Sequence, residues 1–278
     1  MVGRRFCGGV FTCVALVALV ACGSAAAEAP GSVQLGESLR VVDRPNDSAI
    51  RSRSKRAATD AIRSGAKCPL GMVSVDDAYC IDRYEATVEE ILPNGEAVPH
   101  PHNLPVDGLK VRAVSKPGVL PQAFISAHEA QSACRASGKR LCKSWEWRFA
   151  CRGPFQNQYP YGNDRVAGRC NDHGKSAVQA LHVSYKGGFK ALNDPRLGLQ
   201  PGTLAKTAEH EGCESPFGAY DMVGNVHEWV AEGTFAGGYY LDTSLNGEGC
   251  DYQTSRHNAS YHDYSTGFRC CADMPPAP

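Results

Sequence analysis

The stretch "FGAYDMVGNVHEWV", residues 217–230, decides how this chain folds. Gly224 and Asn225 interrupt an apolar run with a turn, and Glu228 follows a few residues later. Carboxylate, amide oxygen and free carbonyl groups are hard ligands that suit calcium. The same residue types also cap backbone groups in a plain turn. From these residues alone we favour the plain turn, and a calcium site is the alternative.

A second stretch, "GFRCC", residues 267–271, places two cysteines side by side near the end of the chain. Adjacent side chains on a strand point to opposite faces. We therefore expect Cys270 and Cys271 to bond to different partners, and not to each other.

The first residues predict export. "MVGRRF" carries two arginines, and the apolar run from Val10 to Val20 is shorter than the roughly 20 residues that a membrane-spanning helix needs. The residues Leu19-Val20-Ala21-Cys22 are typical of a lipobox, whose cysteine is lipidated; an ordinary secretory signal cut near "SAAAEA" is the alternative. Either leader exports the chain to an oxidising space. We expect a lipid anchor at Cys22 that attaches the protein to the bacterial cell envelope, in the outer membrane.

The number of cysteines and the net charge indicate which kinds of bond and partner this chain can have. Thirteen cysteines are present, and Cys7, Cys13 and Cys22 belong to the leader, which leaves ten. An even number in an exported domain predicts five disulfides, although spacing alone does not choose the pairs. No CxxC pair occurs, which argues against a zinc site of the usual spacing. With 29 basic and 29 acidic residues, the net charge is zero and no nucleic-acid partner is expected.

Composition divides the chain into a signal peptide (1–22), a polar tether (23–66), one domain (67–274) and a short tail (275–278). The tether has few aromatic residues and cannot bury enough surface to order itself. The domain contains all three tryptophans, with glycine and proline spread throughout.

Regular secondary structure is expected to be sparse. Ser126 and Glu129 form a capping box for a helix that ends by Gly138, and a second helix is predicted after Ser144, ending at Gly153. Short segments such as "GMVSV", "YCIDRYEAT" and "YSTGFRCC" predict strands between turns. The expected fold is an irregular α+β domain stapled by disulfides, without βαβ units.

Five segments occur in a characteristic order: "GMVSVDDAYCIDRYEAT", "GKRLCKSWEWRFACRG", "YPYG", "FGAYDMVGNVHEWV" and "STGFRCC". Together they resemble the formylglycine-generating enzyme family, also called the sulfatase-modifying factor domain, over nearly all of residues 68–274. The resemblance implies a C-type lectin-like fold. It also changes the favoured interpretation of the turn at 224–225, which in the family is a structural calcium site. The ligands are then expected from Asn225, Glu228, Val223, Gly224 and Val226. A second family calcium site maps less directly onto Asn171, Asp172, Asp194 and Arg196.

The resemblance further implies the disulfides Cys134–Cys270 and Cys151–Cys250. Cys68 and Cys80 bracket a short segment and are expected to close a local loop. For the remaining four we expect Cys170–Cys213 and Cys142–Cys271, although the exact pairing of these four stays open.

Active members of the family hold copper between two further cysteines. The corresponding positions in this chain are Asp242 and Leu245, in a segment about two residues shorter. Copper(I) is a soft ion that prefers thiolates, so oxygen-bearing side chains do not replace the pair. Copper and formylglycine generation are therefore not expected, and no catalytic residue is assigned.

Two functions remain open. The favoured one is a calcium-stabilised, non-catalytic module that binds an envelope protein, peptide or glycan, with the aromatic segments 237–240 and 260–264 as its surface. The alternative is a metal-dependent oxidoreductase that modifies exported proteins with nonheme iron or copper. The metal would then be held by His227, His257 and His262. We favour the alternative that these three histidines lie at the surface or only form hydrogen bonds. The "HPH" at 100–102 is expected in a loop.

Overall fold

The computed structural model describes residues 68–181 and 185–274. These residues fall within one compact unit, Arg53–Pro278. The predicted signal peptide with Cys22, the tether 23–66 and the tail 275–278 lie outside the described residues. Within the described ranges, no helix combines the length and the apolar character needed to cross a membrane.

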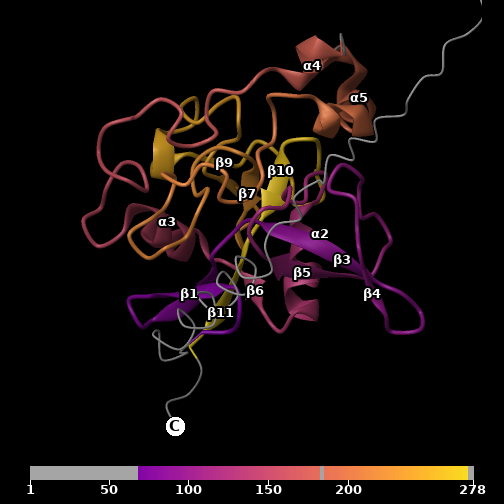
Figure 1. Cartoon of the computed structure of the whole chain (residues 1–278). Coiled ribbons are helices and arrows are strands. Elements are labelled where there is room, and N and C mark those ends of the chain that lie inside the picture. Colours follow the sequence, from indigo (N-terminus) through magenta and orange to yellow (C-terminus); the bar gives the residue numbers. More distant parts are fainter. Residues whose placement is uncertain (1–67, 182–184, 275–278) are drawn as a thin grey trace, which may run out of the picture. The chain divides into compact units, whose positions relative to one another are not determined.

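Three small sheets carry most of the regular structure (Figure 1). The first sheet has the order β1-β2-β11-β6, the second β10-β7-β8-β9, and the third β4-β3-β5. The strands are β1 (Met72–Val75), β2 (Tyr79–Asp82), β3 (Ala86–Ile91), β4 (Ala97–Pro99), β5 (Val111–Ser115), β6 (Arg140–Leu141), β7 (His227–Trp229), β8 (Phe235–Ala236), β9 (Gln253–Thr254), β10 (Thr266–Phe268) and β11 (Cys270–Asp273). The irregular α+β architecture expected from the sequence is therefore confirmed.

Helices are few and short, as expected. They are α2 (Ala127–Ala136), α3 (Ser144–Arg152), α4 (Ala177–Ala180) and α5 (Gly188–Leu192), with 3-10 turns η1 (Tyr185–Gly187), η2 (Pro195–Leu199) and η3 (Gly249–Asp251). The predicted capping box of Ser126 and Glu129 begins α2. Helix α3 starts one residue earlier than predicted, with Lys143 as its N-cap, because the Glu146 carboxylate accepts a hydrogen bond from the Lys143 N–H.

The last two strands form one extended segment that belongs to two sheets. β10 pairs in parallel with β7, so that Gly267 faces Glu228, and β11 pairs with β2 and β6. Gly267 permits this approach, because a Cβ there would lie 2.6 Å from a Val226 methyl and 2.9 Å from the Gln122 carbonyl. Arg269 is the single residue between β10 and β11. The two stretches that open the sequence analysis are thus hydrogen-bonded neighbours.

The two adjacent cysteines enter different cores. Cys270 packs in a cluster with Cys134, Trp229 and Phe268. Cys271 packs in a second cluster around Trp147. Both cysteines are fully buried, as the alternation of side chains along an extended strand requires.

Five disulfides hold the described domain together: Cys68–Cys80, Cys134–Cys270, Cys142–Cys271, Cys151–Cys250 and Cys170–Cys213. They coincide with the five expected pairs, and they use all ten cysteines of the mature domain. Four of them join residues at least 43 positions apart, whereas Cys68 and Cys80 are only 12 apart. The long links contribute most in a chain-entropy account, by about 2–4 kcal/mol each.

We predict that limited reduction opens Cys68–Cys80 first. Cys68 is half-buried, whereas every other cysteine in the described domain is buried, so a thiol reductant reaches this pair without unfolding the domain. Alkylation and peptide mapping after brief reduction should label Cys68 and Cys80, with the near-ultraviolet circular dichroism unchanged. Labelling of Cys142 or Cys271 before Cys68 would contradict the burial seen in the structure.

Candidate functional site

The turn of residues 221–226 packs against a second loop at Asn171. Gly224 and Asn225 have φ angles of 86° and 54°, in the left-handed region. A side chain at Gly224 would collide with the Asn171 carbonyl, so this position requires glycine. The Asn225 N–H donates to that carbonyl at 2.9 Å, and Asn171 Nδ2 donates to Asn225 Oδ1 at 2.9 Å. The two loops that were expected at separate calcium sites therefore bond to each other directly.

The side chain of Asn225 has no unused hydrogen-bonding capacity. Its Oδ1 accepts from Asn171 Nδ2 and from the Ala205 N–H, both at 2.9 Å. Its Nδ2 donates to Glu85 Oε2 at 2.5 Å and to the Ala205 carbonyl at 3.2 Å. An amide offers two donors and two acceptor positions, and all four are occupied here. Asn225 therefore acts as a junction between three chain segments.

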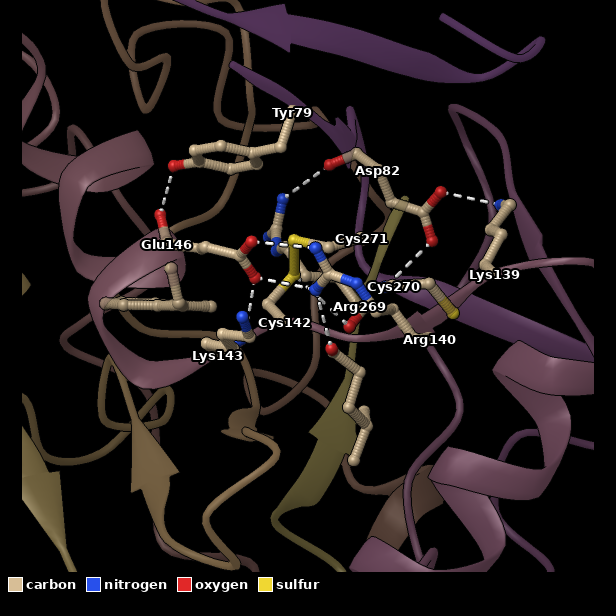
Figure 2. Close-up of a disulfide and its surroundings, with 12 residues drawn as sticks. Tyr79, Asp82, Lys139, Arg140, Cys142, Lys143, Glu146, Arg269, Cys270 and Cys271 are labelled. Carbon is tan, nitrogen blue, oxygen red and sulfur yellow. Dashed lines mark hydrogen bonds and ion pairs between the residues drawn. A yellow bond between two sulfur atoms is a disulfide. The ribbon is translucent and has the colours of Figure 1, made fainter. Parts of the chain in front are cut away.

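Glu228 lies in a buried ion pair. Its Oε1 accepts from Arg269 Nη2 at 2.6 Å, and its Oε2 accepts from Arg269 Nε and from Trp147 Nε1, both at 2.7 Å. The side chains of Arg269 and Glu228 are 0% and 1% exposed. The other guanidinium donors reach the Asp82 carbonyl at 3.1 Å, a contact visible in Figure 2, and the Tyr220 carbonyl at 2.8 Å.

The first predicted calcium set does not fit a cation through its side chains. Asn225 is saturated, and a guanidinium already supplies positive charge to Glu228. Val223 and Val226 are buried among apolar side chains or packed near Gly267. The side chains of Asn225 and Glu228 thus satisfy neighbouring protein groups, as they would in a plain turn. The predicted backbone carbonyl ligands of Val223, Gly224 and Val226 stay a prediction.

The two carboxylates of the second predicted set have different partners. Asp194 caps η2 and pairs with Arg196, whose side chain is 70% exposed. Asp172 is different, because it is 4% exposed and its Oδ2 accepts from Arg165 Nε at 2.8 Å. Its Oδ1 is buried and has no hydrogen-bond partner among the described residues. A buried carboxylate oxygen without a donor is a place where a cation or a water molecule fits.

Further carboxylates surround the ion pair, and no sequence pattern marks them. Glu85 is fully buried and accepts from the Val226 N–H at 3.2 Å. Burial raises its pKa well above the ordinary value, and the nearby charges of Asp221 and Glu228 raise it further. Burial also raises the pKa of Asp221 to about 6. Glu85 stands in the segment "YCIDRYEAT" and Arg269 in "GFRCC", so both lay within the quoted motifs, but no periodicity marks them as partners.

A second set of charges surrounds the Cys142–Cys271 disulfide (Figure 2). Arg140 donates to both carboxylate oxygens of Glu146 at 2.7 Å, and Lys139 pairs with the fully buried Asp82 at 2.6 Å. Asp82 Oδ2 also accepts from the Cys270 N–H at 2.9 Å. These contacts position β6 and β11 on either side of the disulfide.

The positions of the family's copper cysteines form a small turn. Asp242 Oδ1 accepts from the N–H groups of Ser244 and Leu245 at 2.9 and 3.0 Å, and Oδ2 accepts from Tyr252 at 3.1 Å. The side chain of Leu245 is exposed. All ten cysteines of the described domain are in disulfides. No thiolate is therefore available in the described ranges to bind a soft metal ion.

The three histidines border one group of aromatic rings, in which Phe235 contacts both His227 and His257, and Phe189 contacts His262. His227 stacks against Phe235 at 5.1 Å, and burial lowers its pKa to about 3. His257 stacks on Tyr261 at 3.8 Å, and His262 Nε2 lies 3.4 Å from Asp107. Within residues 68–181 and 185–274, no three His, Cys, Asp or Glu side chains converge as a metal site would require.

Two further surface expectations are tested by burial. The segments 237–240 and 260–264 were expected to present aromatic residues to solvent. Tyr240 and Tyr264 are instead 1% and 5% exposed and pack in a core cluster with Phe124 and Leu197, so the expectation is wrong for these two. Tyr239 and Tyr261 are half-buried and keep part of their surface in solvent. The "HPH" segment does lie in a loop, where His102 Nε2 contacts the Gly198 carbonyl at 3.1 Å.

We predict that Arg269→Met strongly destabilises the domain, because it leaves the Glu228 carboxylate buried without a counter-charge. The expected loss in free energy of unfolding is about 3–5 kcal/mol. The matched control is Arg112→Met, which removes a 47% exposed guanidinium from Glu89 and should cost less than about 1 kcal/mol. Denaturant unfolding with intact disulfides measures both values. Equal losses at the two positions would contradict the buried ion pair.

Comparison with known proteins agrees with this architecture. A family model described as the sulfatase-modifying factor enzyme 1-like domain matches residues 29–274. The chain is 32% identical over 120 residues to inactive C-alpha-formylglycine-generating enzyme 2 of Bos taurus, covering 40% of this chain and 33% of that protein. It is 30% identical over 115 residues to formylglycine-generating enzyme of Mus musculus, covering 40% of this chain and 27% of that protein.

The matches to these curated relatives span about a third of their length or less. Among solved structures, PvdO from Pseudomonas aeruginosa aligns with a TM-score of 0.43 and 13% identity, covering 70% of this chain and 80% of that one. The family model, which matches most of the chain, decides the assignment. The chain belongs to the family defined by the sulfatase-modifying factor enzyme 1-like domain.

Proposed function

We propose that this protein is an exported binding module built on the formylglycine-generating enzyme fold, without the copper-dependent oxidation of that family. One observation carries the proposal: all ten cysteines of the described domain are bridged. The resemblance to the family implies that Asp242 and Leu245 stand at the positions of its copper cysteines. A cysteine in a disulfide cannot act as a thiolate ligand. One matched relative, of Bos taurus, is itself named an inactive form of the enzyme.

The place of action follows from the disulfides and the leader. Five bridges are consistent with an exported protein, since such bonds persist in oxidising compartments. The lipobox at Leu19-Val20-Ala21-Cys22 supports a lipid anchor, and the 44 residues of the polar segment 23–66 would then separate the domain from the membrane. We place the protein in the outer membrane of the cell envelope, where it would bind an envelope protein, peptide or glycan.

Calcium is proposed as a structural ion at Asp172, not at Glu228. The buried Oδ1 of Asp172 supports this choice, because calcium prefers carboxylate oxygen together with backbone carbonyls. Asn171 and Asp172 are adjacent, and their loop packs on Gly224 and Asn225. An ion there would hold the loop of Cys170–Cys213 against the turn.

We predict that the protein does not convert a sulfatase-type cysteine peptide to formylglycine when supplied with copper, oxygen and reductant. Mass spectrometry of the peptide should show an unchanged thiol, while an active copper-containing family member converts it in parallel. The double variant Asp242→Cys/Leu245→Cys should stay inactive, because it removes the carboxylate that closes this turn. A loss of thiol mass that depends on this protein would overturn the proposal in favour of a metal-dependent oxidoreductase, as would stoichiometric iron or copper.

We predict that a calcium chelator lowers the melting temperature. A ligand at a hundred times its Kd stabilises the native state by about 2.7 kcal/mol, which for a domain of this size corresponds to roughly 5–10 °C. Asp172→Asn should abolish the chelator effect. Glu228→Gln, the same chemical change in the ion pair, should lower the melting temperature but keep the effect. If the chelator leaves the melting temperature of the wild-type protein unchanged, the proposal of a structural calcium ion is wrong.

A further inference from the structure

A groove lies between helix α2 and the turn of residues 231–233. Its volume is about 440 Å³, which is within the range of small-ligand sites. The floor consists of small or apolar groups, among them Ala127, Leu141 and Ala259. Gly233 also lines the groove, and its φ of 72° lies in the left-handed region that favours glycine. None of these residues belongs to the turn at Asp242 or to the buried ion pair.

The helix wall of the groove presents a row of polar side chains. The spacing of these side chains, three, four and seven residues from the first, puts them on one face of α2. They are His128, Gln131, Ser132 and Arg135. The row from His128 to Arg135 is about 10 Å long at 1.5 Å per helical residue. Three residues of an extended peptide cover about the same length at 3.3 Å each. The groove therefore matches a short extended segment in length.

The charges in the groove are incompletely paired. The guanidinium of Arg135 is exposed and has no hydrogen-bond or ion-pair partner among the described residues. On the opposite wall, Glu232 Oε2 accepts from the Ser144 N–H at 2.8 Å, which partly satisfies that carboxylate. The least compensated charge is thus the positive one at Arg135. A carboxylate is its complementary partner, because guanidinium binds carboxylates through two parallel hydrogen bonds.

We propose that this groove binds an extended peptide segment of about three residues, with an acidic side chain of the peptide against Arg135. The remaining oxygen of Glu232 would accept a peptide N–H from the other wall, and the small floor residues would let the peptide backbone approach closely. This inference rests on the proposed binding function and names its ligand class. A peptide is favoured over a glycan because the groove offers a charged anchor, and its lining contains no Trp, Tyr or Phe side chain on which a sugar could stack.

Arg135 also lies in the last turn of α2, where a positive charge favours the helix dipole. That role predicts a change in stability only. A binding role predicts a change in ligand affinity at unchanged fold, so the two are separated by measuring both quantities on the same variant.

The test uses the mature protein and two pools of capped tetrapeptides, with aspartate or asparagine fixed at the third position and the other positions randomised. We expect the aspartate pool to shift the amide resonances of residues 127–135 and 231–233 and the Arg135 Nε–H resonance, and the asparagine pool to shift them less. Arg135→Gln should weaken binding at least about tenfold, since a charge-assisted hydrogen bond contributes roughly that factor. Arg112→Gln, which removes the same charge from β5, should leave binding unchanged.

Several results would overturn the peptide site. These are equal shifts with both pools, no shifts in the groove, or shifts of the same resonances by an acidic oligosaccharide when neither peptide pool moves them. If Arg135→Gln and Arg112→Gln weaken peptide binding equally, the effect comes from the net charge of the protein and the proposed site at Arg135 is wrong. The proposed function is judged separately, by the absence of cysteine conversion, so a failed peptide titration with an inactive protein refutes this groove and leaves that proposal standing.

Discussion

The buried pair of Arg269 and Glu228 is the interaction on which the rest of the structure depends. Arg269 is the single residue between β10 and β11, and its guanidinium reaches Glu228 on β7 and the carbonyl of Asp82 at the end of β2. One side chain therefore ties the first sheet to the second. A buried charge is costly unless it is paired and hydrogen-bonded, so the groups around Arg269 must keep their positions together. Trp147 adds α3 to the same junction through its bond to Glu228.

Disulfides extend this junction to both faces of the C-terminal segment. Cys270 fixes α2 on one face, and Cys271 fixes the chain just before α3 on the other. Both helices are short, and many strands have only two to four residues, so secondary structure alone provides little cooperativity. Covalent links between distant segments compensate for this, because they reduce the conformational freedom of the unfolded chain. Packing of the core and the buried ion pair then favour one arrangement of the segments among those that the disulfides allow.

This organisation separates stability from the surface that family members use for chemistry. The turn at Asp242 is closed by its own backbone hydrogen bonds, and nothing in the Arg269 junction requires a cysteine there. Under the proposed function, the fold would therefore persist without the oxidation chemistry. Because the contacts that hold the domain together are buried, its exposed helix faces and turns can differ from one family member to another. A binding function would use these exposed surfaces.

Sequence by itself determined the family, the capped start of α2 and the α+β class, and its resemblance to the family implied Cys134–Cys270 and Cys151–Cys250. These features rest on local rules or on ordered motifs, such as the capping box of Ser126 and Glu129, that need no knowledge of distant contacts. The pairing of Cys142, Cys170, Cys213 and Cys271 stayed open until the structure joined Cys142 to Cys271 and Cys170 to Cys213. Tertiary structure alone decided the partners of Asn225 and Glu228. An amide and a carboxylate beside a turn suit calcium or protein donors equally, and the choice depends on whether Asn171 and Arg269, 54 and 41 residues away, arrive at bonding distance. It also decided that Tyr240 and Tyr264 are core residues and that Arg135, which has no partner among the described residues, borders a groove. Burial and charge pairing depend on how separate segments pack, and no local pattern encodes that.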